Sequence, residues 1–74
     1  MENLLKRITI NPAQCGGKPC IRGMRIRIQD VLDLLANGLS REEVLLELPD
    51  LELEDISAVL MYASKSVSHE LILV

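Results

Sequence analysis

The chain has 74 residues, of which 49% are hydrophobic and 26% are charged, and Tyr62 is its single aromatic residue. A chain of this length forms one small domain with a thin core, and this composition is typical of a folded protein. A single aromatic side chain is too few for a surface on which successive single-stranded bases stack. Because the sequence shows neither a membrane-spanning apolar run nor a secretory signal, we expect a cytoplasmic protein without a membrane contact.

The charges are unevenly divided along the chain. Residues 1–27 hold six basic residues against one acidic residue, whereas residues 28–74 hold two basic residues against ten acidic ones. A basic segment attracts phosphate or an acidic protein surface, and an acidic segment repels both. The alternative is that the two parts attract each other, within one fold or across a dimer.

The beginning of the chain is predicted to be extended. Residues 4–10 end in an alternating Ile-Thr-Ile run, which indicates a short strand. A loop rich in Gly and Pro follows, and residues 20–21 and 25–27 are two further short segments with strand character. We expect a small hairpin or a pair of edge strands, which is too short to be stable alone.

Three helices are predicted after this region. An apolar stripe that begins at Ile28 has helical spacing, and Asn37-Gly38 supplies a left-handed stop. Ser40 and Glu43 form the signature of a capping box at the start of a second helix, which Pro49 closes. A third helix is expected from near residue 52 to residue 65, and its start is poorly capped, because Glu is not a favoured N-cap.

These elements predict a mainly α fold, a tri-helical bundle with a short N-terminal β-hairpin or strand region. The last two helices are joined by a turn of about four residues, which matches the outline of a helix-turn-helix. We expect a single domain over residues 1–74, with a basic strand and loop region at 1–27, a three-helix core at 28–65 and an apolar tail at 66–74.

No catalytic chemistry is expected. The one histidine, His69, has no nucleophile and orienting group placed around it, so the protein is predicted not to be an enzyme and to use no cofactor. Cys15 and Cys20 are expected to be reduced thiols, because no export signal is present. A metal or redox role is the alternative, but zinc would need more ligands than these residues supply.

DNA contact is expected from the basic loop and not from the third helix. The second helix of a helix-turn-helix enters the major groove with its first residues, and here that segment carries three carboxylates that phosphates would repel. The candidate DNA-binding residues are Lys18, Arg22, Arg25 and Arg27. Their alternative role is to cap helix ends or to pair with the acidic helices.

Two stretches of the sequence resemble a known family. They are the run Gly16-Gly17-Lys18-Pro19-Cys20-Ile21-Arg22-Gly23 and the turn Leu48-Pro49-Asp50-Leu51. Over residues 8–63 the chain is similar to the small bacterial and archaeal proteins grouped as domain of unknown function 433, described as antitoxins of the virulence-associated type with a homeodomain-like helix-turn-helix. It departs from the family at Met24 and Glu52, which stand where Thr is usual. The second change weakens a helix cap by about 1 kcal/mol.

The resemblance implies a type II antitoxin that binds a PIN-like ribonuclease toxin, and antitoxins of this class commonly bind operator DNA as well. Since the rim of a ribonuclease site should be basic, the expected contact surface is acidic and extends to the turn residues Glu52, Glu54 and Asp55. The apolar tail is expected to pack against the toxin or a second copy, which would form a homodimer. The candidate partner-binding residues are Glu42, Glu43, Glu47, Leu53, Leu71 and Leu73. A stand-alone DNA-binding regulator and a dimeric interaction module without DNA binding remain the alternatives.

Overall fold

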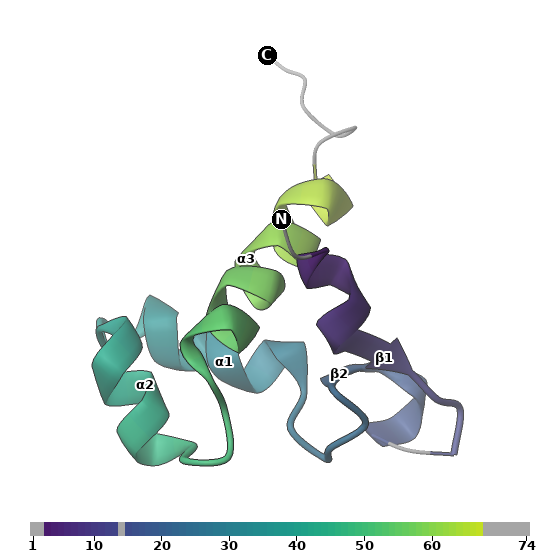
Figure 1. Cartoon of the computed structure of the whole chain (residues 1–74), viewed down its shortest axis with the longest axis horizontal. Coiled ribbons are helices and arrows are strands. Elements are labelled where there is room, and N and C mark those ends of the chain that lie inside the picture. Colours follow the sequence, from purple (N-terminus) through teal and green to yellow (C-terminus); the bar gives the residue numbers. More distant parts are fainter. Residues whose placement is uncertain (1–2, 14, 68–74) are drawn as a thin grey trace.

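The computed structural model describes residues 3–13 and 15–67 (Figure 1). The elements in chain order are the 3-10 helix η1 (Leu4–Arg7), strand β1 (Ile8–Ile10), the 3-10 turn η2 (Cys15–Gly17), strand β2 (Pro19–Ile21) and the helices α1 (Ile28–Ala36), α2 (Arg41–Glu47) and α3 (Leu53–Val67). The prediction of a mainly α fold with three helices and short N-terminal strands is confirmed. Among the described residues, no helix has the length and apolar character needed to cross a membrane.

The first residues differ from the sequence prediction of a strand over 4–10. Residues 4–7 form η1 because the side chain of Asn3, a favoured N-cap, accepts a hydrogen bond from the N–H of Leu5 at 3.1 Å. The strand is therefore confined to β1, which pairs antiparallel with β2 and sets Ile8 opposite Ile21. Figure 1 shows η1 beside α3, so the start of the chain covers one side of the last helix.

The ends of the first two helices confirm the signals seen in the sequence. After α1 the chain reverses at Gly38, which has a φ of 95° and donates its N–H to the carbonyl of Leu35 at 3.0 Å. At the start of α2, the N–H of Glu43 donates to Oγ of Ser40 at 3.1 Å, and the N–H of Ser40 donates to Oε1 of Glu43 at 2.7 Å. These two bonds complete the predicted capping box.

One core joins the strands to the three helices. Its buried side chains come from β2, all three helices and the turn before α3; they are Ile21, Ile28, Val31, Val44, Leu51, Ile56 and Val59. All are aliphatic, as the composition requires. Since this core holds β2 against α1 and α3, the loop on either side of β2 has a fixed position relative to the helices.

Candidate functional site

The loop before β2 is closed by a disulfide between Cys15 and Cys20. The expectation of two reduced thiols is therefore wrong for this structure. Residues 15–17 all have positive φ, at 53°, 63° and 79°, so the chain curls back and brings Cys15 beside the buried Cys20. Gly16 and Gly17 adopt this conformation at little cost. The prediction of reduced thiols depends on the cell compartment, whereas the pairing depends on this local turn.

A basic cavity of about 470 Å³ lies beside this loop, lined by Cys15, Gly16, Lys18, Arg25 and Arg27. Three of the four predicted DNA-binding side chains therefore meet at one place. Within the described residues, Lys18 and Arg25 take part in no ion pair. Because these two cations have no carboxylate partner there, they are available to an anion that enters the cavity.

Arg27, the third cation of the basic cavity, is held by the start of α1. Its guanidinium group lies 2.9 Å from Oδ1 of Asp30, and its backbone N–H donates to Oδ2 of Asp30 at 3.1 Å. Burial acts to raise the pKa of the Asp30 carboxyl, but the hydrogen bonds from Arg27 outweigh it and lower that pKa below its usual range. Arg27 is thus fixed in position, with part of its charge balanced.

Arg22, the fourth predicted DNA-binding residue, faces a different side of the fold. Its Nε donates to Oδ1 of Asp55 at 3.0 Å, and its Nη2 donates to Oδ2 of Asp55 at 2.8 Å and to the carbonyl of Asp50 at 3.0 Å. Arg22 does not line the basic cavity. The structure therefore shows for Arg22 the alternative role, in which the arginine pairs with an acidic helix.

Asp55 is fully buried at the start of α3. Besides Arg22, it accepts hydrogen bonds from Nη1 of Arg7 at 2.9 Å and from the N–H of Glu52 at 2.8 Å. Burial acts to raise the pKa of the Asp55 carboxyl, but the hydrogen bonds from Arg22, from the Glu52 N–H and from Arg7 together lower it below its usual range. We call Arg7, Arg22, Glu52 and Asp55 the Asp55 cluster.

This burial corrects the expectation that Asp55 belongs to the acidic contact surface. Its carboxylate lies in the first turn of α3, where it satisfies a backbone N–H that no helical carbonyl can reach. The turn carboxylate of Glu52 is also engaged, because Nη1 of Arg7 lies 2.9 Å from its Oε1. Of the three turn carboxylates, Glu54 alone has no ion pair within the described residues.

The outer side of α2 carries the other predicted partner-binding carboxylates. At 100° per residue, Glu42 and Leu46 lie nearly opposite the buried Val44, and Glu43 and Glu47 extend from them along one flank of the helix. We call these four residues the acidic face. Leu46 is 80% exposed at the middle of this face. The sequence analysis missed it, although the helical period counted from Val44 could have shown it.

The remaining predicted partner-binding residues, Leu53, Leu71 and Leu73, do not belong to α2. Leu53 begins α3 and is exposed. Leu71 and Leu73 lie outside the described residues. Glu43, although exposed, has one carboxylate oxygen occupied by the capping box. No carboxylate of α2 takes part in an ion pair in the described part of the chain, and Glu42 and Glu47 are those that are also outside the capping box.

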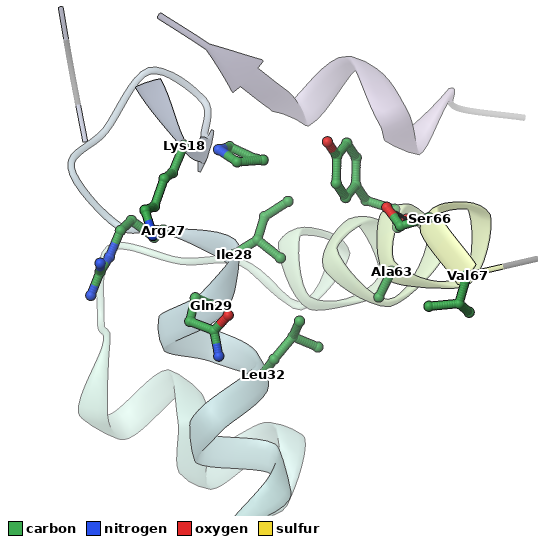
Figure 2. Close-up of a pocket in the computed structure, with 10 residues that line it drawn as sticks. Lys18, Arg27, Ile28, Gln29, Leu32, Ala63, Ser66 and Val67 are labelled. Carbon is green, nitrogen blue, oxygen red and sulfur yellow. Dashed lines mark hydrogen bonds between the residues drawn. The ribbon is translucent and has the colours of Figure 1, made fainter. Parts of the chain in front are cut away.

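A second hollow is an apolar groove of about 310 Å³ between α1 and α3. Ile28 and Leu32 of α1 face Ala63 and Val67 of α3 across it, as Figure 2 shows. Lys18 and Arg27 lie at one end, and these two residues also line the basic cavity. The sequence analysis assigned the apolar residues of both helices to the core and so did not predict an open groove.

Residues 8–63 match the family described as Protein of unknown function (DUF433). The chain belongs to this family. The comparisons with curated proteins and with solved structures each returned no match. The matched part of this DUF433 domain contains β1, β2, α1, α2 and most of α3, and with them the basic cavity, the acidic face and the whole Asp55 cluster except Arg7.

The described part of this DUF433 domain has three surfaces that another molecule can reach. Within residues 3–13 and 15–67, no group of three or more His, Cys, Asp or Glu side chains is arranged to hold a metal ion. The buried carboxylate of Asp55 is surrounded by its own partners and lines neither the basic cavity nor the apolar groove. What remains exposed is a basic cavity, an acidic face and an apolar groove, each suited to contact with another molecule.

Proposed function

We propose that this DUF433 domain is a cytoplasmic, non-enzymatic antitoxin that binds a PIN-like ribonuclease toxin and also binds the phosphates of operator DNA. The observation that carries the proposal is the separation of its available charges. Lys18 and Arg25 lie at the basic cavity, whereas Glu42 and Glu47 lie on α2. Opposite charges on different elements allow a basic protein and a polyanion to be bound at different places.

The acidic face is the surface proposed for the toxin. Exposed carboxylates speed association with a basic partner and disfavour acidic ones. Most of the affinity in such interfaces comes from a few apolar or aromatic anchors that become buried. Leu46, exposed between Glu42 and Glu47, has the position of such an anchor. Leu53, which is exposed at the start of α3 and lies outside the acidic face, is proposed as a second anchor for the toxin.

The basic cavity is the surface proposed for DNA. The first turn of α3 is unsuited to it, because Asp55 is buried there and Glu52 and Glu54 are exposed acids. Cations in a loop cavity contact the phosphate backbone, which fixes position on DNA without reading its sequence. The proposed DNA contact is therefore electrostatic and involves Lys18, Arg25 and, with part of its charge balanced, Arg27.

The toxin half of the proposal is tested with the ribonuclease encoded beside this protein's gene. The wild-type domain should bind that ribonuclease and block its RNA cleavage. Leu46→Ala should weaken the binding at least tenfold, and Leu60→Ala, an exposed leucine on α3, serves as the matched control. No inhibition by the wild-type domain, or no ribonuclease gene beside it, would contradict the antitoxin assignment.

The DNA half is tested by the salt dependence of binding to a duplex from the promoter of the same gene. Three phosphate contacts predict that log affinity falls with log salt at a slope of about −2.7. Lys18→Ala combined with Arg25→Ala should flatten the slope to about −0.9. Lys6→Ala removes a cation that lines neither cavity and is the control. A steep slope without toxin binding would favour the stand-alone regulator.

A further inference from the structure

The apolar groove between α1 and α3 is open although its walls are aliphatic. Val67 at its edge is 61% exposed, and the half-buried Leu32 and Ala63 line its sides. In Figure 2 the side chains that line the groove extend from Val67 at one end to Lys18 at the other. A continuous apolar surface of this kind normally marks a contact with another molecule.

We propose that residues 70–74 of a second copy of this chain fill the apolar groove, so that two chains exchange these segments in a symmetric dimer. The proposal goes beyond the antitoxin assignment and does not depend on it. It identifies both the surface and its occupant, and it leaves the acidic face on α2 available to another partner.

The chemistry of residues 70–74 fits the groove. Leu71 to Val74 are four successive apolar residues, and Glu70 precedes them. The cations at one end of the groove are Lys18 and Arg27, and no acidic residue among residues 3–13 and 15–67 lines it. A segment with one carboxylate followed by aliphatic side chains therefore complements the groove in charge and in polarity.

The length of the segment is also sufficient. Seven residues follow Val67 in the chain, and an extended chain spans about 3.3 Å per residue, or roughly 23 Å in all. By comparison, the part of α3 from Tyr62 to Val67 that lines the groove rises by only about 7.5 Å. The segment can therefore leave one protomer and still run along the groove of its partner.

The occupant is a second copy because the chain's own segment would have to reverse at once. Ser66 and Val67 line the groove themselves, so entry from the same chain requires a sharp turn directly after α3. Helices usually reverse with Gly or Asn in the left-handed conformation. This chain does so after α1 at Gly38, with a φ of 95°. Residues 63–74 contain no Gly, Asn or Pro.

The test is the mass of the purified 74-residue chain in solution, measured by light scattering over a range of concentrations. The wild-type chain should be a dimer, and removal of residues 70–74 should give a monomer with an unchanged helical circular dichroism spectrum. Two groove variants should also give monomers: Ala63→Glu, and Val67→Glu at an exposed position where a charge does not disturb the core. Leu46→Ser removes exposed apolar surface on α2 and should leave the dimer intact.

A mixing experiment separates exchange between chains from a contact within one chain. The Ala63→Glu chain keeps the segment and the shortened chain keeps the groove, so at high concentration a mixture should form a heterodimer through one contact. A wild-type monomer at every concentration would overturn the proposal. So would a dimer that survives loss of residues 70–74, a dimer that survives both groove variants, or a mixture that stays monomeric.

Discussion

The guanidinium group of Arg22 donates to both carboxylate oxygens of Asp55, at 3.0 Å from Nε to Oδ1 and at 2.8 Å from Nη2 to Oδ2. Arg7 and the N–H of Glu52 complete the set of donors around the same carboxylate. The Asp55 cluster therefore ties η1 and the turn after β2 to the start of α3. It holds the N-terminal region, which carries the basic cavity, against the helices.

Asp55→Asn should lower the free energy of unfolding by about 3 kcal/mol, because it leaves two arginines without their buried acceptor charge. Glu54→Gln changes the neighbouring exposed carboxylate and should alter the free energy of unfolding by less than about 0.5 kcal/mol. Urea unfolding followed by circular dichroism measures both. Equal values for the two variants would mean that the cluster contributes little to stability.

Acid should destabilise the protein through the same carboxylate. The pKa of Asp55 is lower in the folded state than its ordinary value of 3.8, so folding favours the ionised form. This stability is fully present above the unfolded-state pKa and is lost as the pH falls below 3.8 and through the lower folded-state pKa. Urea midpoints are measured at pH 7, 5 and 3. The midpoint at pH 3 should be lower than the midpoint at pH 5. Asp55→Asn should show a smaller fall, and an identical pH profile in this variant would contradict the assignment to Asp55.

Ser40→Ala should lower the free energy of unfolding by about 1 kcal/mol, because the N–H of Glu43 loses its acceptor at the start of α2. Ser64→Ala, at an exposed position inside α3, is the matched control and should change stability by less than about 0.5 kcal/mol. Thermal and urea unfolding of both variants measure the difference. If Ser64→Ala lowers the free energy of unfolding as much as Ser40→Ala does, the loss at Ser40 does not come from the helix cap.

Reversal of Glu42 and Glu47 to Lys should slow association with the proposed toxin and weaken the salt dependence of the rate. Glu43 is left unchanged, because its carboxylate belongs to the capping box and its loss would disturb α2. Dissociation should change much less, whereas Leu46→Ala should mainly accelerate dissociation. Stopped-flow measurements separate the two rates. An unchanged association rate in the doubly reversed protein would place the contact elsewhere.

Local signals in the sequence predicted the helices well. The capping box at Ser40 and the stop at Gly38 depend on residues close together in the chain, and both are present in the structure. The first residues were predicted less well, because an Asn3 cap produces η1 where the apolar residues suggested a strand. Signals of this kind compete over a few residues, and tertiary contacts decide between them.

The site residues were harder to predict because their environment depends on distant parts of the chain. The pattern on α3 places Asp55 among exposed acids, and only the approach of Arg7 and Arg22 makes its burial favourable. Lys18, Arg25 and Arg27 were identified from charge alone, but the curl of residues 15–17 is what gathers them around one cavity. The exposure of Leu46 follows from the helical period, which was applied only to core positions.

The long sequence separations within the Asp55 cluster bear on the order of folding. The ion pair between Arg7 and Asp55 joins residues 48 positions apart, whereas α2 and α3 are connected by a short turn. Closing a loop of that length costs roughly 2 kcal/mol more conformational entropy than closing a five-residue turn. The helices can therefore assemble before the N-terminal segment docks. Loss of the Asp55 carboxylate should then accelerate unfolding while the rate of folding stays nearly unchanged.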